Sequence, residues 1–231
     1  MCSLRRHANH LIMNGCDFYP KLVVLSESQT LRLLYEKHEV ETHMAQARTL
    51  DEAQIKRVQR YLRTRRNSTR DSTIFTFAFN TGLRAKELAA LCVGDAYDVE
   101  GAVRDAFVLQ RSQTKGARTR TVYINRNLRV ALEQYRTTLY SVEPTAPLFE
   151  SRKGGHFSAN TMCQLFLNVF ADCGLSGATS HTPRRTFTTQ LANKGVDVRV
   201  LAELAGHSSI SVTQRYIDVN DAQLVRAVEL L

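Results

Sequence analysis

From Thr49 onward, hydrophobic residues recur at the spacing of an α-helix, with polar residues between them. In the first such segment Ile55, Val58 and Leu62 repeat at helical intervals behind Asp51, a residue type that often caps a helix N-terminus. Because side chains at this spacing share one face, the pattern predicts an amphipathic helix whose apolar face is turned toward a core.

The next helical segment is apolar on nearly every side. Asp71 is placed to cap its start and Gly82 to end it. Its apolar residues are Ile74, Phe75, Phe77, Ala78 and Phe79. Since such a helix leaves no face for solvent, we expect it to be buried in the core. A basic cluster of Arg63, Arg65 and Arg66 lies in the loop before it.

Helical patterns also fill most of the rest of the chain. They are expected at Leu128–Tyr140, from Ser158 onward, and at Thr182–Lys194, Asp197–Ala205, Ser211–Ile217 and Asp221–Leu231. Gly195 and Gly206 each follow one of these segments. They are expected to end them, because glycine adopts the left-handed conformation of a helix C-terminus at little cost.

Between residues 106 and 124 the periodicity changes to the alternation of β-strands. Phe107 and Leu109 alternate on one strand, Val122 and Ile124 alternate on the other, and a basic loop that contains glycine separates them. This pattern predicts a β-hairpin with a basic tip. The fold is therefore expected to be mainly α-helical with one small antiparallel β-sheet, in the α+β class.

The amino-terminal residues 1–48 differ from the rest of the chain. They are mixed in charge, with one short apolar run at Leu22–Leu25, and are fewer than an independent domain usually has. We expect residues 1–48 to form a short arm and residues 49–231 to form the main domain. A chain of 231 residues that is 43% hydrophobic can bury one sizeable core.

The charge balance favours a polyanionic partner. The chain has 31 Lys and Arg against 22 Asp and Glu, which gives a net charge of +9. Because each neutralised phosphate releases counterions, nucleic acid is the first candidate for such a partner. Charge alone is weak evidence, since many basic proteins bind no nucleic acid.

The cysteines and the hydropathy pattern indicate the cellular environment. Five scattered cysteines that never form a CxxC pair predict neither a disulfide framework nor a zinc site; they are Cys2, Cys16, Cys92, Cys163 and Cys173. No apolar run reaches the length of a membrane span, and the first residues lack the apolar core of a signal peptide. We expect a cytoplasmic protein with no membrane partner.

Several residues that can perform chemistry also have ordinary structural explanations. Arg84, beside the glycine that ends the buried helix, would by itself be a surface arginine paired with Glu87. Lys115, at the hairpin tip, would be a solubilising turn residue. His207 follows a helix end, where histidine often contacts the last carbonyls, and Tyr216 would be a half-buried aromatic residue of a short helix.

His181 and Arg184 are separated by one helical turn. Pro183 suits the first turn of a helix, so both side chains can lie on one side of its N-terminus, where unpaired N–H groups can receive a phosphate. A lone histidine near an arginine is more often structural. Taken one at a time, none of these residues identifies a function.

Taken in order, however, their local sequences resemble the tyrosine recombinase (phage integrase) family. The family's TGLRxxEL box is matched at Thr81–Leu88 and its KGxKxRxV loop at Lys115–Val122, with Arg118 in place of the second lysine. The HxLRHTFAT box is matched at His181–Thr189, and LGHSSIxTTxxY at Ala205–Tyr216. The resemblance extends from Thr49 to Leu231, with Thr49–Glu52 at the place where the family often has LTxxE.

The departures from the family pattern are mild. Pro183 replaces a leucine, Arg185 the second histidine and Ala205 the leucine before Gly206, and an aromatic residue expected near Asp95 is missing. Most relatives carry a core-binding domain of nearly a hundred residues before the catalytic domain. The segment of residues 1–48 is much shorter, and it therefore resembles the reduced core-binding segment of minimal integrases and fimbrial phase-variation invertases.

The resemblance implies a covalent mechanism. Tyr216 would be the nucleophile that exchanges a DNA phosphodiester for a 3′-phosphotyrosyl bond, and His181 would accept its proton. Lys115 would protonate the departing 5′ oxygen, which an ammonium can do and a guanidinium cannot.

The same resemblance assigns the phosphate contacts. Arg84 and Arg184 would bind the non-bridging oxygens, with a further hydrogen bond from His207. No metal or other cofactor is implied, since the two arginines supply the charge that paired metal ions provide elsewhere. Glu87 would orient the neighbouring arginine, while Asp95 and Glu203 are interpreted as structural.

The implied partner is double-stranded DNA, bound by a homotetramer on two sites, with accessory DNA-bending proteins as possible helpers. The expected DNA contacts outside the catalytic set are Arg63, Arg65, Arg66, Arg118, Arg120 and Arg185. An apolar stripe of Leu224, Val225, Val228 and Leu231 would dock in a neighbouring protomer or on its own domain, and the sequence leaves both open.

Two other functions fit the same residues less well. A type IB topoisomerase shares the chemistry and would relax supercoiled DNA without sequence preference. A non-catalytic DNA-binding regulator on the same fold would have no reason to keep Lys115, His181, His207 and Tyr216 together with both arginines. We therefore expect a site-specific recombinase of the integrase or invertase type.

Overall fold

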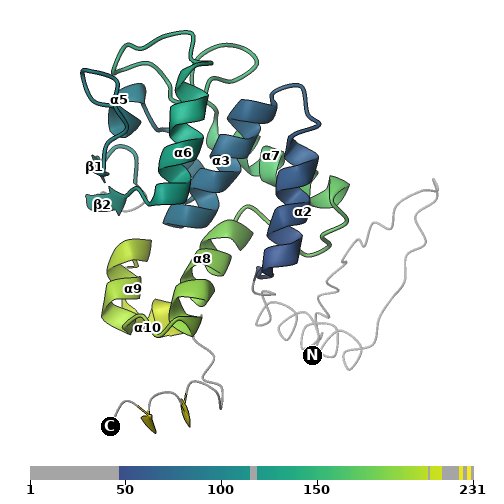
Figure 1. Cartoon of the computed structure of the whole chain (residues 1–231), viewed down its shortest axis with the longest axis vertical. Coiled ribbons are helices and arrows are strands. Elements are labelled where there is room, and N and C mark those ends of the chain that lie inside the picture. The colour runs from purple at the N-terminus through teal and green to yellow at the C-terminus, as the bar shows by residue number, and fades with distance from the viewer. Residues whose placement is uncertain (1–46, 115–118, 208, 215–223, 226–227, 230–231) are drawn as a thin grey trace, which may run out of the picture. The chain divides into compact units, whose positions relative to one another are not determined.

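A computed structural model of the chain describes residues 47–114, 119–207, 209–214, 224–225 and 228–229 (Figure 1). Several sequence predictions fall outside these residues. They concern the amino-terminal arm up to residue 46 and the side chains of Lys115, Arg118, Tyr216 and Leu231.

The described part of the chain is mostly helical with one two-stranded antiparallel sheet, which confirms the predicted fold class. The helices are α2 (Glu52–Leu62), α3 (Ser68–Thr81), α4 (Ala85–Ala89), α5 (Val93–Ala96), α6 (Arg126–Arg136), α7 (Ala159–Asp172), α8 (Thr182–Asn193), α9 (Val198–Ala205) and α10 (Ile210–Gln214). The strands are β1 (Ala106–Leu109) and β2 (Arg120–Tyr123). No helix within the described residues is long and apolar enough to cross a membrane.

Helix α2 forms as its sequence pattern predicts. The Asp51 carboxylate accepts a hydrogen bond from the backbone N–H of Gln54 at 2.8 Å, and the Gln54 side chain accepts one from the N–H of Asp51. This reciprocal cap satisfies two backbone donors that a helix start would otherwise leave open. Val58 and Leu62 are the buried residues of α2, so the predicted amphipathic face is confirmed.

Helix α3 is the buried helix of the domain, as expected, but it begins earlier than Asp71. Its first residue is Ser68, and Asp71 lies in the first turn, 1% exposed, between the side chains of Arg65 and Arg70. The prediction that Asp71 is the N-cap is therefore wrong, because its carboxylate is held by two guanidinium groups. The helix ends where predicted, at Gly82 in the left-handed conformation with φ 63°.

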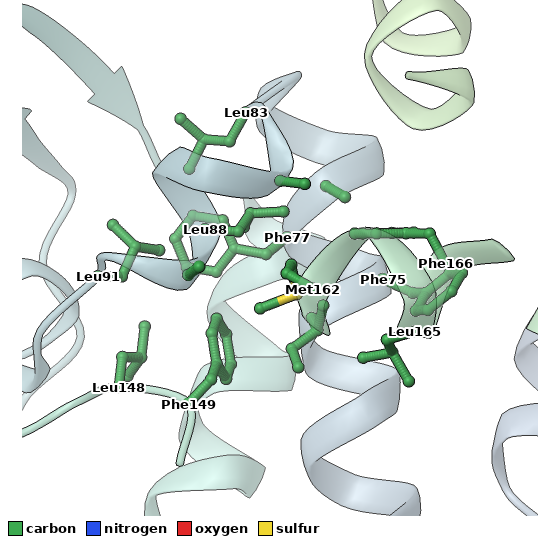
Figure 2. Close-up of a cluster of buried hydrophobic side chains, with 14 of the residues drawn as sticks. Phe75, Phe77, Leu83, Leu88, Leu91, Leu148, Phe149, Met162, Leu165 and Phe166 are labelled. Atoms are coloured by element: carbon green, nitrogen blue, oxygen red, sulfur yellow. The ribbon is translucent and has the colours of Figure 1, made fainter. Parts of the chain in front are cut away.

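Aromatic side chains fill the core around α3 (Figure 2). Phe75 of α3 packs on Phe166 and Phe170 of α7, with ring centroids 4.6 and 5.6 Å apart, and Phe77 packs edge-on against Phe149. Full burial of a phenylalanine side chain stabilises a fold by about 2–3 kcal/mol. Helices α6 and α8 also pack on α3, so α3 holds the parts of the domain together.

The predicted hairpin is present. Phe107 pairs with Val122, and Leu109 pairs with Arg120, in one antiparallel ladder. Phe107, Leu109 and Val122 are buried, whereas the alternate residue Val108 is 46% exposed. The hairpin therefore covers the core with one face, as its alternation of polar and apolar residues predicts.

Helices α8, α9 and α10 complete the described domain (Figure 1). Helix α8 packs on α3, α9 contacts β2, and α10 packs on α9. Helix α8 begins with Pro183 in its first turn, and α9 ends at Gly206 with φ 63°, both as predicted. Helix α6 ends at Arg136, four residues before the predicted Tyr140. The backbone N–H of Leu50 donates to the hydroxyl of Thr186 at 3.0 Å, which ties the start of the domain to α8.

Candidate active site

The first part of the candidate site lies just beyond the end of α3. Arg84 precedes α4, and the Glu87 carboxylate accepts hydrogen bonds from both the Arg84 backbone N–H at 2.8 Å and its Nη1 at 2.9 Å. Glu87 is 1% exposed, while the Arg84 side chain is 28% exposed. The predicted pair is present, and it holds an accessible guanidinium on a buried carboxylate.

A second arginine binds the same carboxylate. Arg120 of β2 donates from Nη2 to Glu87 Oε2 at 2.8 Å and from Nη1 to the Leu204 carbonyl at 2.6 Å. Its side chain is 6% exposed. The expectation that Arg120 contacts DNA is therefore corrected: its guanidinium lies inside the protein and joins the sheet to α4 and to the end of α9.

Arg184 approaches the same region from α8. Its Nη1 donates to the carbonyl of Gly82 at 2.9 Å, two residues before Arg84 in the chain. Gly82 permits this approach, because a Cβ atom there would lie 2.6 Å from the Phe187 ring of α8. Packing of α8 on the end of α3 therefore brings Arg184, which is 5% exposed, beside the turn that carries Arg84.

His207 follows the glycine that ends α9. Its Nδ1 lies 2.8 Å from the hydroxyl of the fully buried Thr213 on α10, a contact that orients the ring. Burial and the positive charges of Arg184, Arg84 and Arg120 lower the pKa of His207 to about 4. The imidazole is therefore neutral at physiological pH, and the charges of all three arginines disfavour its protonated form.

The charge of Glu87 is also set by these neighbours. Burial alone would raise the pKa of Glu87, but the charges of Arg120 and Arg84 and the hydrogen bonds from Arg84 outweigh burial and lower it. The carboxylate is therefore ionised. Burial lowers the pKa of Arg120, and the facing Glu87 opposes that change.

His181 stands at the start of α8, where the sequence predicts it. It occupies the cap position before Thr182, is exposed, and accepts a hydrogen bond from the Arg185 N–H at its carbonyl. It lies one helical turn before Arg184. The structure thus brings Arg84, Arg184 and His207 together, with His181 on the same helix start as Arg184.

The other predicted DNA contacts lie elsewhere. Arg63 and Arg66 are exposed in the loop between α2 and α3, one helix length, or about 20 Å, from Gly82. Arg65 is 22% exposed and donates from Nε to Asp71 at 3.0 Å, so its guanidinium is engaged within the protein, and its contact with DNA stays a prediction. Arg185 is half-buried on α8.

Two features of the site escaped the sequence analysis. The alternation that turns Val122 and Ile124 inward also turns Arg120 inward, so the burial of Arg120 could have been predicted from the same pattern. The Gln113 side chain donates to Asp95 at 2.8 Å and anchors the segment after β1. Long-range side-chain pairs of this kind leave no periodic signal.

Chemically, the arrangement suits a tetrahedral anion. Guanidinium groups present paired N–H donors that match phosphate oxygens, and a neutral imidazole adds a directional hydrogen bond. Within the described residues, no group of three His, Cys, Asp or Glu side chains is placed to hold a metal ion.

Comparison with known proteins agrees with the sequence and the geometry. The sequence profile of the phage integrase family matches residues 48–223. The chain is 32% identical over 167 residues to tyrosine recombinase XerC of Brucella suis biovar 1 (strain 1330). The aligned segment covers 70% of this chain and 50% of that protein. The chain therefore spans about half the length of such curated relatives.

Solved structures show the same fold. The crystal structure of XerA recombinase superposes with a TM-score of 0.63 at 24% identity, over 79% of this chain and 64% of that one. The Tn1549 transposon integrase in complex with a circular intermediate DNA gives 0.65 at 20% identity, over 81% and 67%. The chain belongs to the phage integrase family of tyrosine recombinases, and its described part has the catalytic-domain fold of that family.

Proposed function

We propose that the chain is a site-specific DNA recombinase of the integrase or invertase type, which cuts and rejoins DNA through a 3′-phosphotyrosyl bond made by Tyr216. The observation that carries this proposal is the convergence of Arg84, Arg184 and His207 from three separate segments. Arg184 donates to Gly82, two residues from Arg84, and the pKa of His207 is lowered by burial and by the charges of both arginines.

The two arginines act on the phosphate. In-line attack produces a pentacoordinate phosphorus with extra negative charge on its non-bridging oxygens, and fixed guanidinium donors stabilise that charge more than they stabilise the ground state. Glu87 orients Arg84 through two hydrogen bonds and is too deeply buried to reach the DNA itself. The role of Glu87 is thus positioning.

His207 supplies a hydrogen bond to the same phosphate. Its depressed pKa keeps it neutral, so it adds direction without another full charge. Thr213 fixes the orientation of the ring. Removal of one such preorganised donor typically costs about 3 kcal/mol of transition-state stabilisation, or about a hundredfold in rate.

The covalent step is assigned on the family's motifs. The phenolic oxygen of Tyr216 attacks phosphorus, the bond from phosphorus to the 5′ oxygen breaks, and the phenolic proton passes to His181. Lys115 gives a proton to the departing 5′ oxygen. Because the phosphotyrosyl bond conserves the energy of the phosphodiester, religation is the reverse of the same step and requires no nucleotide cofactor.

Double-stranded DNA is the proposed partner. The net charge of +9 favours it, the Tn1549 integrase of the same fold was solved with DNA, and the exposed Arg63 and Arg66 suit contacts with the phosphate backbone. We propose a homotetramer on two DNA sites, with accessory DNA-bending proteins where the sites require them. The C-terminal residues Leu224, Val225 and Val228 are 55%, 61% and 67% exposed and are candidates for a link to a neighbouring protomer.

The test is a search for the covalent adduct. The protein is incubated with a pool of nicked duplexes of randomised sequence, and DNA that stays attached to protein in detergent is isolated and sequenced. We expect an adduct with the wild type, none with Tyr216→Phe, and a normal amount with the control Tyr140→Phe, since Tyr140 is 95% exposed.

The two alternative functions, a DNA-binding regulator and a type IB topoisomerase, predict different results in the same adduct assay. Duplexes that bind without any adduct would indicate a DNA-binding regulator and contradict the proposal, and an adduct that persists in Tyr216→Phe would contradict the assignment of the nucleophile. Adducts without sequence preference, together with relaxation of supercoiled plasmid, would indicate a type IB topoisomerase.

A further inference from the structure

Arg120 is the side chain that joins three elements of the candidate site. It belongs to β2, donates to Glu87 of α4 at 2.8 Å, and donates to the Leu204 carbonyl in the last turn of α9 at 2.6 Å. The three elements are far apart in the sequence, since Arg120 lies 33 residues from Glu87 and 84 residues from Leu204. One guanidinium therefore fixes how they meet.

The end of α9 is fitted closely around the stem of this arginine. A Cβ atom at Gly206 would lie 2.7 Å from Arg120 Cδ, so the close approach and the left-handed turn both require glycine there. His207 is the next residue. The stem of Arg120 thus supports the turn that presents His207, while its head group holds the carboxylate that orients Arg84.

Only arginine can make both contacts. Its planar fork points two N–H groups in different directions from a fixed position, whereas a lysine ammonium is a single point charge on a flexible chain. The guanidinium is 6% exposed, so it is not a surface charge selected for solubility. A packed apolar side chain often stabilises a fold as well as a buried ion pair does, so stability alone does not require an arginine at this position.

We propose that Arg120 is a positioning residue of the DNA cleavage reaction, which holds Arg84 through Glu87 and holds His207 through the end of α9. This proposal rests on the function proposed above. Arg120 itself makes no contact with the scissile phosphate. Its loss frees Glu87 Oε2 from one of its two donors and leaves the Leu204 carbonyl without this bond, so both phosphate-binding groups lose their alignment.

The first experiment compares Arg120 with a matched arginine. Arg129 of α6 also donates to a backbone carbonyl, that of Val103 at 2.6 Å, and pairs with the carboxylate of Asp105. It makes neither of the contacts that Arg120 makes with Glu87 and Leu204. The variants are Arg120→Lys, Arg120→Met, Arg129→Lys and Arg129→Met. Adduct formation is measured at saturating nicked DNA, and DNA affinity and thermal stability are measured separately.

We expect Arg120→Lys to slow adduct formation at saturating DNA by about 10- to 100-fold, with DNA affinity changed by less than about threefold. The Arg129 variants should form adduct within about twofold of the wild-type rate. If Arg120→Lys reacts at the wild-type rate, or loses only as much as Arg129→Lys, the proposal is overturned. Arg120→Met extends the test to the loss of the charge.

A double-mutant cycle separates positioning from general loss of structure. If Arg120 acts through Arg84, then Arg120→Lys should slow an Arg84→Lys protein far less than it slows the wild type. A purely structural role would instead multiply the two losses. Equal factors in both backgrounds would therefore overturn the proposal even if Arg120→Lys alone were slow.

A third measurement does not depend on activity. The pKa of the His207 ring is followed by NMR titration, and it should rise in Arg120→Met but not in Arg129→Met. An unchanged His207 would overturn the link from Arg120 to the end of α9. If the wild type forms no adduct, the proposed function fails, yet this titration still tests where Arg120 acts.

Discussion

The two ends of helix α3 carry similar clusters with different consequences. Near its start, Asp71 lies between Arg65 and Arg70, and just beyond its end Glu87 lies between Arg84 and Arg120. Both carboxylates belong to residues that are 1% exposed. A buried acid between two arginines is therefore not by itself the mark of an active site.

The cluster at the start of α3 is closed. Arg65 lies over the ring of Tyr61, with its guanidinium carbon 5.8 Å from the centroid, and Arg70 lies over Phe157 at 5.0 Å. Arg70 also donates to the carbonyl of Glu150 at 2.8 Å. These contacts direct both guanidiniums into the protein, so this cluster stabilises the helix start.

The cluster beyond the end of α3 remains electropositive. Burial lowers the pKa of His207, and the charges of Arg184, Arg84 and Arg120 lower it further, although Glu87 pairs with two of these arginines. The comparison shows that the useful signal is not the ion pair but the positive potential that remains after the pair has formed.

The largest expected difference concerns two arginines of similar exposure, Arg84 at 28% and Arg65 at 22%. Arg84→Ala should slow adduct formation by about 10²- to 10³-fold, because a phosphate contact is lost. Arg65→Ala should lower the melting temperature but keep the rate per folded molecule within about threefold. Single-turnover cleavage and thermal denaturation measure the two effects. Equal loss of rate in both variants would remove the distinction between the clusters.

The carboxylates should separate stability from catalysis. Asp71→Asn is expected to lower the free energy of unfolding by about 3 kcal/mol, because two buried guanidiniums lose their charged partner. The cleavage rate of its folded fraction should be retained. Glu87→Gln should reduce both quantities, since Arg84 loses its orienting group. Urea unfolding and single-turnover cleavage test this, and an Asp71→Asn protein that is stable but inactive would contradict it.

The sequence predicts what is local in this structure. The Asp51 cap, the glycine ends of α3 and α9, the inward face of the hairpin and the pair of Arg84 with Glu87 all depend on residues within a few positions of each other. Each of these follows from helical or strand periodicity and from the conformational freedom of glycine.

What the sequence does not predict depends on packing between distant segments. The bond from Arg184 to Gly82 joins residues 102 apart and exists because α8 packs on the end of α3. Because aspartate is a common cap, the sequence predicts Asp71 at the helix start, whereas its carboxylate lies in the first turn and pairs with Arg65 and Arg70. The roles of Tyr216 and Lys115 stay predictions that rest on family motifs.

The acid dependence of stability tests the surroundings of His207 in the cluster beyond the end of α3. The pKa of His207 is lowered from its ordinary 6.5 to about 4, so the unfolded chain binds a proton more readily than the folded protein between these values. Stability should therefore fall as the pH drops from about 6.5 to 4, by about 1–2 kcal/mol after allowance for solvent screening. Glu87, whose pKa is also lowered, adds a further loss at lower pH.

The measurement is urea unfolding of the wild type and of His207→Gln across this pH range. The variant should lack the part of the slope that lies between pH 6.5 and 4. An NMR titration that finds the pKa of His207 at or above 6.5 would contradict the combined effect of burial and the three arginines on this ring.

The smallest expected effect is the binding of a free anion. Inorganic phosphate should stabilise the wild type at constant ionic strength, because the cluster of Arg84, Arg184 and His207 can receive a tetrahedral anion. A concentration near the dissociation constant stabilises by about 0.4 kcal/mol, and tenfold more gives about 1.4 kcal/mol. Arg84→Ala should abolish this gain, whereas Arg65→Ala should keep it, because Arg65 pairs with Asp71 at the other end of α3, away from Arg184 and His207. Thermal denaturation with and without phosphate measures the gain, and its survival in Arg84→Ala would place the anion elsewhere on the protein.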